Sequence, residues 1–172
     1  VMACSQGTSA IFTVGGVDYR SGARYVSYET IKGGFGARPT KDGVNGMSSG
    51  ISNTMNTPIE ILEMSFPVRI ERYAILPDSG GVGRWRGGCG VERVWRILGK
   101  PAQVSVCCER SVAPPFGLAG GGPGGPARVL LISPDGRERV LNTKGTFTVP
   151  PGAQVVMHAP GSGGYGPMSE RD

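Results

Sequence analysis

Alternation of apolar and polar residues is the clearest pattern in the second half of the chain. Within residues 66–76, Val68 and Ile70 alternate with charged residues, so that the apolar side chains point to one side. A period of two indicates a half-buried β-strand. The alternation changes phase near Arg72, which indicates either a β-bulge at that point or full burial of the strand.

Similar stretches predict a series of further strands. In residues 103–109, Val104, Val106 and Cys108 would form the inner face. The other predicted strands are residues 11–14, 24–30, 90–98, 127–133, 139–141, 146–149 and 153–159. Short strands with frequent turns are typical of all-β domains. We therefore predict a mainly β fold with a few short helices, an antiparallel β sandwich or barrel-like domain preceded by a loop-rich segment.

One short helix is predicted between the loop-rich segment and the later strands. Thr57 would be its N-cap, Pro58 its first residue and Glu60 its third. This arrangement is a capping box, with proline at the position where its missing N–H costs nothing. Ile59, Leu62 and Met64 would then pack inward against the β domain.

The loop-rich segment contains the strongest candidate for a binding site. A glycine-rich turn with Gly33, Gly34 and Gly36 follows the strand predicted at residues 24–30. Glycine lets backbone N–H groups approach a ligand closely. The alternatives are a tight bend in a β protein and, for the two asparagines nearby, ordinary capping and turn chemistry. The polar residues on both sides of the turn are Glu29, Arg38, Asn53 and Asn56.

The composition fits a folded chain that is rich in loops. The 172 residues include 30 glycines and 14 prolines, without a collagen period and with apolar runs between them. A chain of this length can bury a core without disulfides. We divide it into a glycine-rich loop segment (1–65), an antiparallel β domain (66–168) and a polar tail (169–172) that is expected to fray.

The charge pattern argues against nucleic acid as a partner. The formal net charge is +5, but arginines such as Arg72, Arg93 and Arg96 are scattered along the predicted strands. Nucleic-acid binding requires a clustered basic stripe or a recognisable module. Scattered arginines are typical of a solvated strand face or a protein interface. Without a transmembrane run or a signal peptide, we expect no membrane partner and a cytoplasmic location.

Metal and redox chemistry have few candidate residues. The four cysteines form no Cys-x-x-Cys pair, and the adjacent Cys107 and Cys108 would point to opposite faces of a strand. We interpret the cysteines as small buried hydrophobes in a reducing compartment. The single histidine, His158, has no neighbours at the spacing of a zinc module. No metal ligand is therefore predicted in this chain.

Several motifs, taken together, resemble the hydantoinase B/oxoprolinase family. They occur in order over nearly the whole chain, and they resemble the C-terminal portion of the family's B subunit. That subunit is much longer than this chain, so we expect the site to be completed by an N-terminal B region. The motifs are ACSQGT, YETIKGGFGARPTKDG, SNTMNTPIEILE, FPVRIERYAILPDSGGVGRWRGGCGVER and VPPGAQVVMHAPGSGGYG.

The resemblance implies an ATP-dependent enzyme that opens a cyclic amide such as a hydantoin, 5-oxoproline or a lactam. An A-type subunit would bind ATP and Mg and would phosphorylate the carbonyl oxygen of the substrate. A divalent metal would be held by residues of the N-terminal B region or chain, outside this chain. The expected partners are therefore that B region, the A-type subunit and a small-molecule substrate, and this chain alone would be inactive.

The resemblance also assigns roles to the candidate residues. Phosphorylation turns the carbonyl oxygen into a leaving group, so the site must stabilise negative charge and exclude water. Arg38 and the N–H groups of the glycine turn would stabilise the charge, and Glu29 would orient a water or an arginine. Glu29 and Arg38 are thus the predicted catalytic residues. The predicted substrate-binding residues are Gln6, Gly33, Gly34, Gly36, Asn53 and Asn56.

Three other functions remain open at this point. The chain could belong to a related ATP-dependent ketone carboxylase. It could also be a non-catalytic structural or interaction subunit of such a complex. The third alternative is a stand-alone cupin-like binder of small molecules, against which the absence of a histidine-rich metal set argues.

Overall fold

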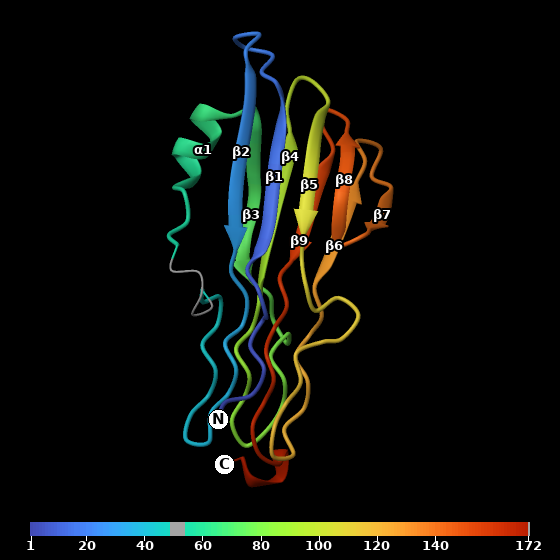
Figure 1. The fold of residues 1–172 in the computed structure, drawn as a ribbon. Coiled ribbons are helices and arrows are strands. Elements are labelled where there is room, and N and C mark those ends of the chain that lie inside the picture. The colour runs from blue at the N-terminus through green and yellow to red at the C-terminus, as the bar shows by residue number, and fades with distance from the viewer. Residues whose placement is uncertain (49–53, 172) are drawn as a thin grey trace.

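The computed structural model describes residues 1–48 and 54–171. Strands fill the upper half of the molecule, and extended segments without regular secondary structure fill the lower half (Figure 1). The mainly β prediction is confirmed. The elements are β1 (Ala10–Val17), β2 (Arg24–Ile31), α1 (Ile59–Ser65), β3 (Val68–Ile75), β4 (Val91–Ile97), β5 (Ala102–Cys107), β6 (Arg128–Ile132), β7 (Glu138–Leu141), β8 (Lys144–Val149), β9 (Gln154–His158) and a 3₁₀ turn, η1 (Met168–Glu170).

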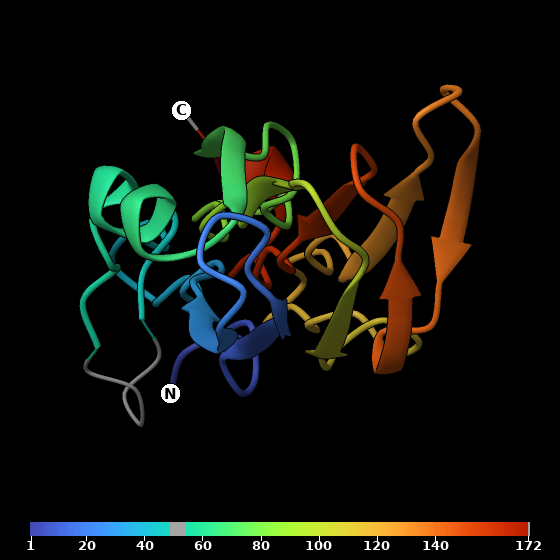
Figure 2. The same cartoon turned by 90° about the horizontal axis from the view of Figure 1, so that it is seen from above.

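The strands form two antiparallel sheets that pack face to face. The first sheet has the order β2-β1-β5-β8, and the second has the order β3-β4-β9-β6-β7. Seen from above, they form two layers (Figure 2). The first sheet combines strands from both sides of residue 66, because β1 pairs with β5. The predicted division into a loop segment (1–65) and a β domain (66–168) stays a prediction.

Period-two alternation places the apolar side chains between the sheets. Phe12 of β1 stacks on Trp95 of β4, with ring centroids 3.9 Å apart and an interplanar angle of 9°. Cys108 is buried and Cys107 is exposed, so the two point to opposite faces as predicted. The interpretation of the cysteines as buried hydrophobes is therefore wrong for Cys107. The predicted break near Arg72 is also confirmed, because the β3–β4 register shifts between Ile70 and Arg72.

The predicted capping box is wrong, although the helix exists. The N-cap of α1 is Pro58, and the helix has no side-chain cap hydrogen bond. The Thr57 hydroxyl instead donates to Oε1 of Glu29 at 2.6 Å, so a tertiary partner has replaced the local one. Leu62 is buried as predicted, whereas Met64 is 74% exposed because it lies on the outer side of the helix.

The lower half is held together by a bundle of extended segments, which we call the glycine bundle (residues 33–47, 79–90, 115–125 and 159–166). Backbone hydrogen bonds join these segments, for example from Gly34 N–H to the Pro160 carbonyl at 3.0 Å. The buried Ser162 hydroxyl donates toward the carbonyls of Phe35 (2.7 Å) and Gly88 (3.0 Å). Three segments are thus tied at one side chain.

Glycine is required in the bundle because the backbones approach closely. A Cβ atom on Gly34 would lie 2.0 Å from the carbonyl oxygen of Gly88, and one on Gly161 would lie 1.7 Å from that of Ser79. The glycine run 120–125 belongs to the same packing, since a Cβ on Gly121 would lie 2.3 Å from the Gly164 carbonyl group.

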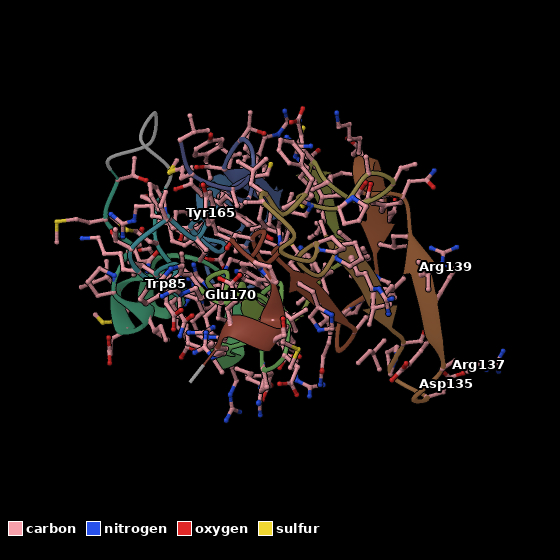
Figure 3. All side chains as sticks on the ribbon, turned by 90° about the horizontal axis from the view of Figure 1, so that it is seen from below. Trp85, Asp135, Arg137, Arg139, Tyr165 and Glu170 are labelled. Atoms are coloured by element: carbon pink, nitrogen blue, oxygen red, sulfur yellow. The ribbon has the colours of Figure 1, made fainter. Side chains whose placement is uncertain are left out.

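The end of the described chain closes the bottom of the bundle. Both carboxylate oxygens of Asp42 accept hydrogen bonds from the Arg171 guanidinium, each at 3.1 Å. The Glu170 carboxylate pairs with Arg84 at 3.3 Å, and the backbones of Trp85 and Tyr165 form a β-bridge beside Arg84 (these residues other than Arg84 are labelled in Figure 3). Glu170 and Arg171 thus make polar contacts with distant residues, while the expected fraying of the tail stays a prediction.

Candidate functional site

Glu29 lies between the two sheets rather than in an open loop. It points inward from β2 and is 5% exposed. Its Oε2 accepts a hydrogen bond from Nη1 of Arg93, on β4 of the opposite sheet, at 2.8 Å. Its Oε1 accepts the Thr57 hydroxyl. Glu29 therefore orients an arginine, as one of its two predicted roles required, while a part in catalysis stays a prediction.

Arg93 is a functional candidate that sequence reasoning missed. The sequence pattern favours a solvated strand face or a protein interface for such scattered arginines, and neither holds for Arg93 within this chain, because its side chain is 1% exposed. Its guanidinium carbon lies 5.0 Å from the ring centroid of Tyr73 and 5.1 Å from that of Trp95. The available signal was its position two residues before Trp95, which puts both side chains on the inner face.

The guanidinium of Arg93 also has spare hydrogen-bonding capacity. Its Nε and Nη2 atoms are buried and have no hydrogen-bond partner in the part of the chain that the structure describes. Stacking on aromatic faces stabilises a cation without using these N–H donors. The Glu29–Arg93 pair is therefore only partly satisfied by hydrogen bonds, which is unusual for a buried polar group.

Of the two predicted asparagines, only Asn56 lies within the described residues. Asn56 is exposed, and its Nδ2 donates to the hydroxyl of Tyr73 at 2.8 Å. Since Tyr73 also contacts Arg93, Asn56 is connected to the Glu29–Arg93 pair through one ring. Asn53 lies outside the described residues.

The glycine turn lies in the glycine bundle, and its N–H groups are engaged there. Those of Gly34, Phe35 and Gly36 donate to the Pro160 carbonyl, the Val44 carbonyl and the Ser5 hydroxyl respectively. These three donors already have partners within the chain, and their part in stabilising a developing charge stays a prediction. Substrate binding by Gly33, Gly34 and Gly36 stays a prediction.

Gln6 packs directly against this turn. It is 1% exposed, and its backbone N–H donates to the Gly34 carbonyl at 3.0 Å. A Cβ on Gly33 would lie 2.1 Å from Oε1 of Gln6, so glycine is needed beside it. Neither polar atom of the Gln6 side-chain amide has a hydrogen-bond partner among the described residues. The amide is thus a buried polar group with unused hydrogen-bonding capacity.

Arg38 lies in the glycine bundle, whereas Glu29 lies on β2 in the β sandwich. It is half-buried, and its guanidinium carbon lies 6.0 Å from the ring centroid of Phe35. Its Nε is buried without a hydrogen-bond partner in the described chain. The structure thus groups Glu29 with Arg93 and Asn56, and it groups Arg38 with the glycine turn.

Lys32 is a second residue that the sequence analysis did not single out. It directly follows β2 and is 4% exposed. Its Nζ donates to the hydroxyls of Thr54 (2.5 Å) and Thr30 (3.4 Å). Burial lowers the pKa of Lys32 from its ordinary value, and the Glu29 carboxylate opposes that shift. A lysine is by default assigned to the surface, so the sequence offered no signal.

Two further titratable groups, His158 and Cys108, are respectively paired and inert. His158 Nε2 lies 2.9 Å from Oε2 of Glu92. Burial, and secondarily the neighbouring Cys107, raises the pKa of Cys108 to about 12, so its thiol stays protonated. Among the described residues, no group of three or more His, Cys, Asp or Glu could hold a metal ion. No helix in the described part is long and apolar enough to cross a membrane.

Comparison with known proteins shows the family to which the chain belongs. The family described as hydantoinase B/oxoprolinase matches residues 1–168, and the chain belongs to this family. It is 38% identical over 164 residues to 5-oxoprolinase 1 of Arabidopsis thaliana, which covers 95% of this chain and 12% of that protein.

Solved structures share the fold. The ATP-dependent caprolactamase of Pseudomonas jessenii matches 100% of this chain and 31% of its own, with a TM-score of 0.87 and 31% identity. Acetone carboxylase matches 100% of this chain and 27% of its own, with a TM-score of 0.85 and 18% identity, which shows the fold alone. The chain thus spans less than a third of each of these proteins.

Proposed function

We propose that this chain is the C-terminal part of the B component of an ATP-dependent enzyme that hydrolyses a cyclic amide. The observation that carries the proposal is the likeness to caprolactamase over the whole chain, at 31% identity. Membership of the hydantoinase B/oxoprolinase family supports it. The proposal includes an A-type partner that uses ATP and Mg, an N-terminal B region that holds a divalent metal, and a cytoplasmic location.

The proposed chemistry follows from the stability of the amide. Resonance makes direct attack by water slow, and phosphorylation of the carbonyl oxygen would supply a leaving group. The B component must then hold the activated substrate, stabilise the leaving charge and exclude water. We assign charge stabilisation to Arg38, because its buried Nε has no partner among the described residues. The unpartnered amide of Gln6 supports substrate binding beside the glycine turn.

Glu29 has a more limited part in this proposal. Both of its carboxylate oxygens accept hydrogen bonds, from Thr57 and from Arg93. A carboxylate held in this way is suited to position Arg93 between the sheets. We therefore propose Glu29 as a positioning residue of the site, with Asn56 linked to it through Tyr73.

The test is the substitution Arg38→Ala in the complete enzyme, assayed with its ATP-using component. We expect kcat/KM for ATP-dependent ring opening of lactams and hydantoins to fall by about a hundredfold, the usual effect of losing one charge-stabilising donor. The matched control is Arg139→Ala, which removes an exposed arginine of β7 (Figure 3). If Arg38→Ala retains the activity of the control, Arg38 has no part in the mechanism.

The same assay separates the alternative functions. Bicarbonate-dependent consumption of a ketone, without ring opening, would identify a carboxylase; the likeness to acetone carboxylase carries only the fold. A structural or interaction subunit would place residues 28–56 far from the metal of the complete complex. A structure of the complex with metal bound would decide between this possibility and a part in catalysis.

A further inference from the structure

Lys32 is a buried cation whose hydrogen-bond partners are neutral. Strand β2 ends where the sandwich meets the glycine bundle (Figure 1). Lys32 directly follows β2 and is almost fully buried. Its Nζ donates to the hydroxyls of Thr54 and Thr30, neither of which carries charge. Buried lysines are rare without a partner of opposite charge, because an unpaired ammonium loses its hydration.

The Glu29 carboxylate, which acts electrostatically on Lys32, does not fill this role. Glu29 lies on the inner face of β2, whereas Thr30 and Lys32 alternate to the other face. Both oxygens of Glu29 are already engaged, by Thr57 and Arg93. Among the described residues Lys32 forms no ion pair within 4.0 Å, and residues 49–53 (Ser-Gly-Ile-Ser-Asn) contain no acidic side chain.

We propose that Lys32, with the hydroxyls of Thr30 and Thr54, forms a subsite for the oxyanion of a small molecule, a phosphoryl or carboxylate group. A partly desolvated ammonium binds an oxyanion through a charge-assisted hydrogen bond. The two hydroxyls lie 2.9 Å from each other and both accept from the Lys32 ammonium, so an anion bound to Lys32 would lie beside them.

The surroundings of Lys32 fit such a ligand. Thr54 is exposed, so the ammonium lies just below the surface. Tyr28 is on the same face of β2 as Thr30 and is 59% exposed, which gives the rest of a ligand an aromatic surface. The subsite goes beyond the proposed function, because it assigns a ligand chemistry and not a reaction. It does not depend on the substrate being a cyclic amide.

The test measures binding of inorganic phosphate and of acetate to the complete B-type protein by calorimetry. We expect phosphate or acetate to bind the native protein, and Lys32→Met to lose affinity by about tenfold or more, the effect of one charge-assisted hydrogen bond. Lys32→Arg should retain part of the affinity. The matched control is Lys100→Met, which removes the same charge at an exposed turn and should leave binding unchanged.

A second measurement does not depend on the folding of a variant. Peptide mass spectrometry follows the rate at which Lys32 is acetylated in the native protein. This rate should fall when phosphate is added, whereas the rate at Lys100 should not change. Preference for phosphate over acetate identifies the phosphoryl group, and the reverse identifies a carboxylate. The proposal is overturned if phosphate and acetate bind Lys32→Met as tightly as they bind the native protein. It is also overturned if neither anion binds the native protein, because another part of the subunit then supplies the counter-ion.

Discussion

At the scale of single residues, Glu29 and Arg93 occupy positions where apolar side chains ordinarily fill a β sandwich. Each faces inward, and together they join β2 of the first sheet to β4 of the second. Removing two charges from water costs several kcal/mol per ion, which their attraction offsets only in good geometry. Tyr73 and Trp95 contribute by covering the guanidinium. The pair is thus costly to break from either side.

We expect Glu29→Gln to destabilise the protein by about 3 to 5 kcal/mol, because it leaves a buried guanidinium without a counter-charge. Urea unfolding measures the change. The control is Arg137→Ala, which breaks an exposed pair with Asp135 at the β6–β7 turn (Figure 3) and should have a much smaller effect. A double variant with Arg93→Met should be more stable than Glu29→Gln alone; additive losses would show that the two residues do not interact.

At the scale of elements, the molecule combines two kinds of packing. The strands bury alternating apolar side chains, whereas the glycine bundle brings backbones together with almost no side chains between them. Backbone hydrogen bonds such as those of Gly34 and Gly88 then join neighbouring segments. This packing has little tolerance, because even one methyl group meets a carbonyl oxygen.

Gly34→Ala tests this packing. Its Cβ would lie 2.0 Å from the Gly88 carbonyl oxygen, so the backbone of one segment must move. We expect a loss of about 1 to 3 kcal/mol or more in the free energy of unfolding, as for other overpacked sites. Gly16→Ala in β1 is the control, since its nearest neighbours would be at 3.4 Å, an ordinary contact. Equal stability of the two variants would contradict the close packing of the bundle.

At the scale of the whole molecule, contacts between distant residues close the lower end. Asp42 accepts hydrogen bonds from the Arg171 guanidinium and, at 2.7 Å, from the backbone N–H of Arg86. These bonds tie the second bundle segment and the end of the described chain to the first bundle segment. The Arg171 guanidinium, together with the Arg86 N–H, holds the pKa of the Asp42 carboxyl below its usual 3.8, although burial opposes the shift.

This shift predicts a pH dependence. Since the folded pKa of Asp42 is lower than the unfolded one, its contribution to stability is full above the unfolded pKa and is lost as the pH falls through the folded value. The Asp42→Asn variant should therefore be less stable than the native protein at pH 7, and the difference should shrink below about pH 4. Urea midpoints at both pH values measure it. A difference that is constant with pH, or one matched by Asp135→Asn, would contradict this role.

The sequence alone determined the class of fold, because side-chain period and turn residues act locally. The strands, the bulge near Arg72 and the opposite orientations of Cys107 and Cys108 all follow from a period of two. The family motifs also lie in the sequence itself. Local rules failed at Thr57, where a hydroxyl that can cap a helix donates instead to a carboxylate from another strand.

Only the tertiary structure decided how the candidate site is built. Burial of Arg93 depends on a partner 64 positions away, and that of Lys32 on a segment 22 positions away. The sequence predicted that the N–H groups of the glycine turn would face a ligand, yet neighbouring segments supply their hydrogen-bond acceptors. A residue's type states which bonds it can form, but the packing of distant segments decides which of them it forms. For this reason the chemistry of Glu29 was visible in the sequence and its partner was not.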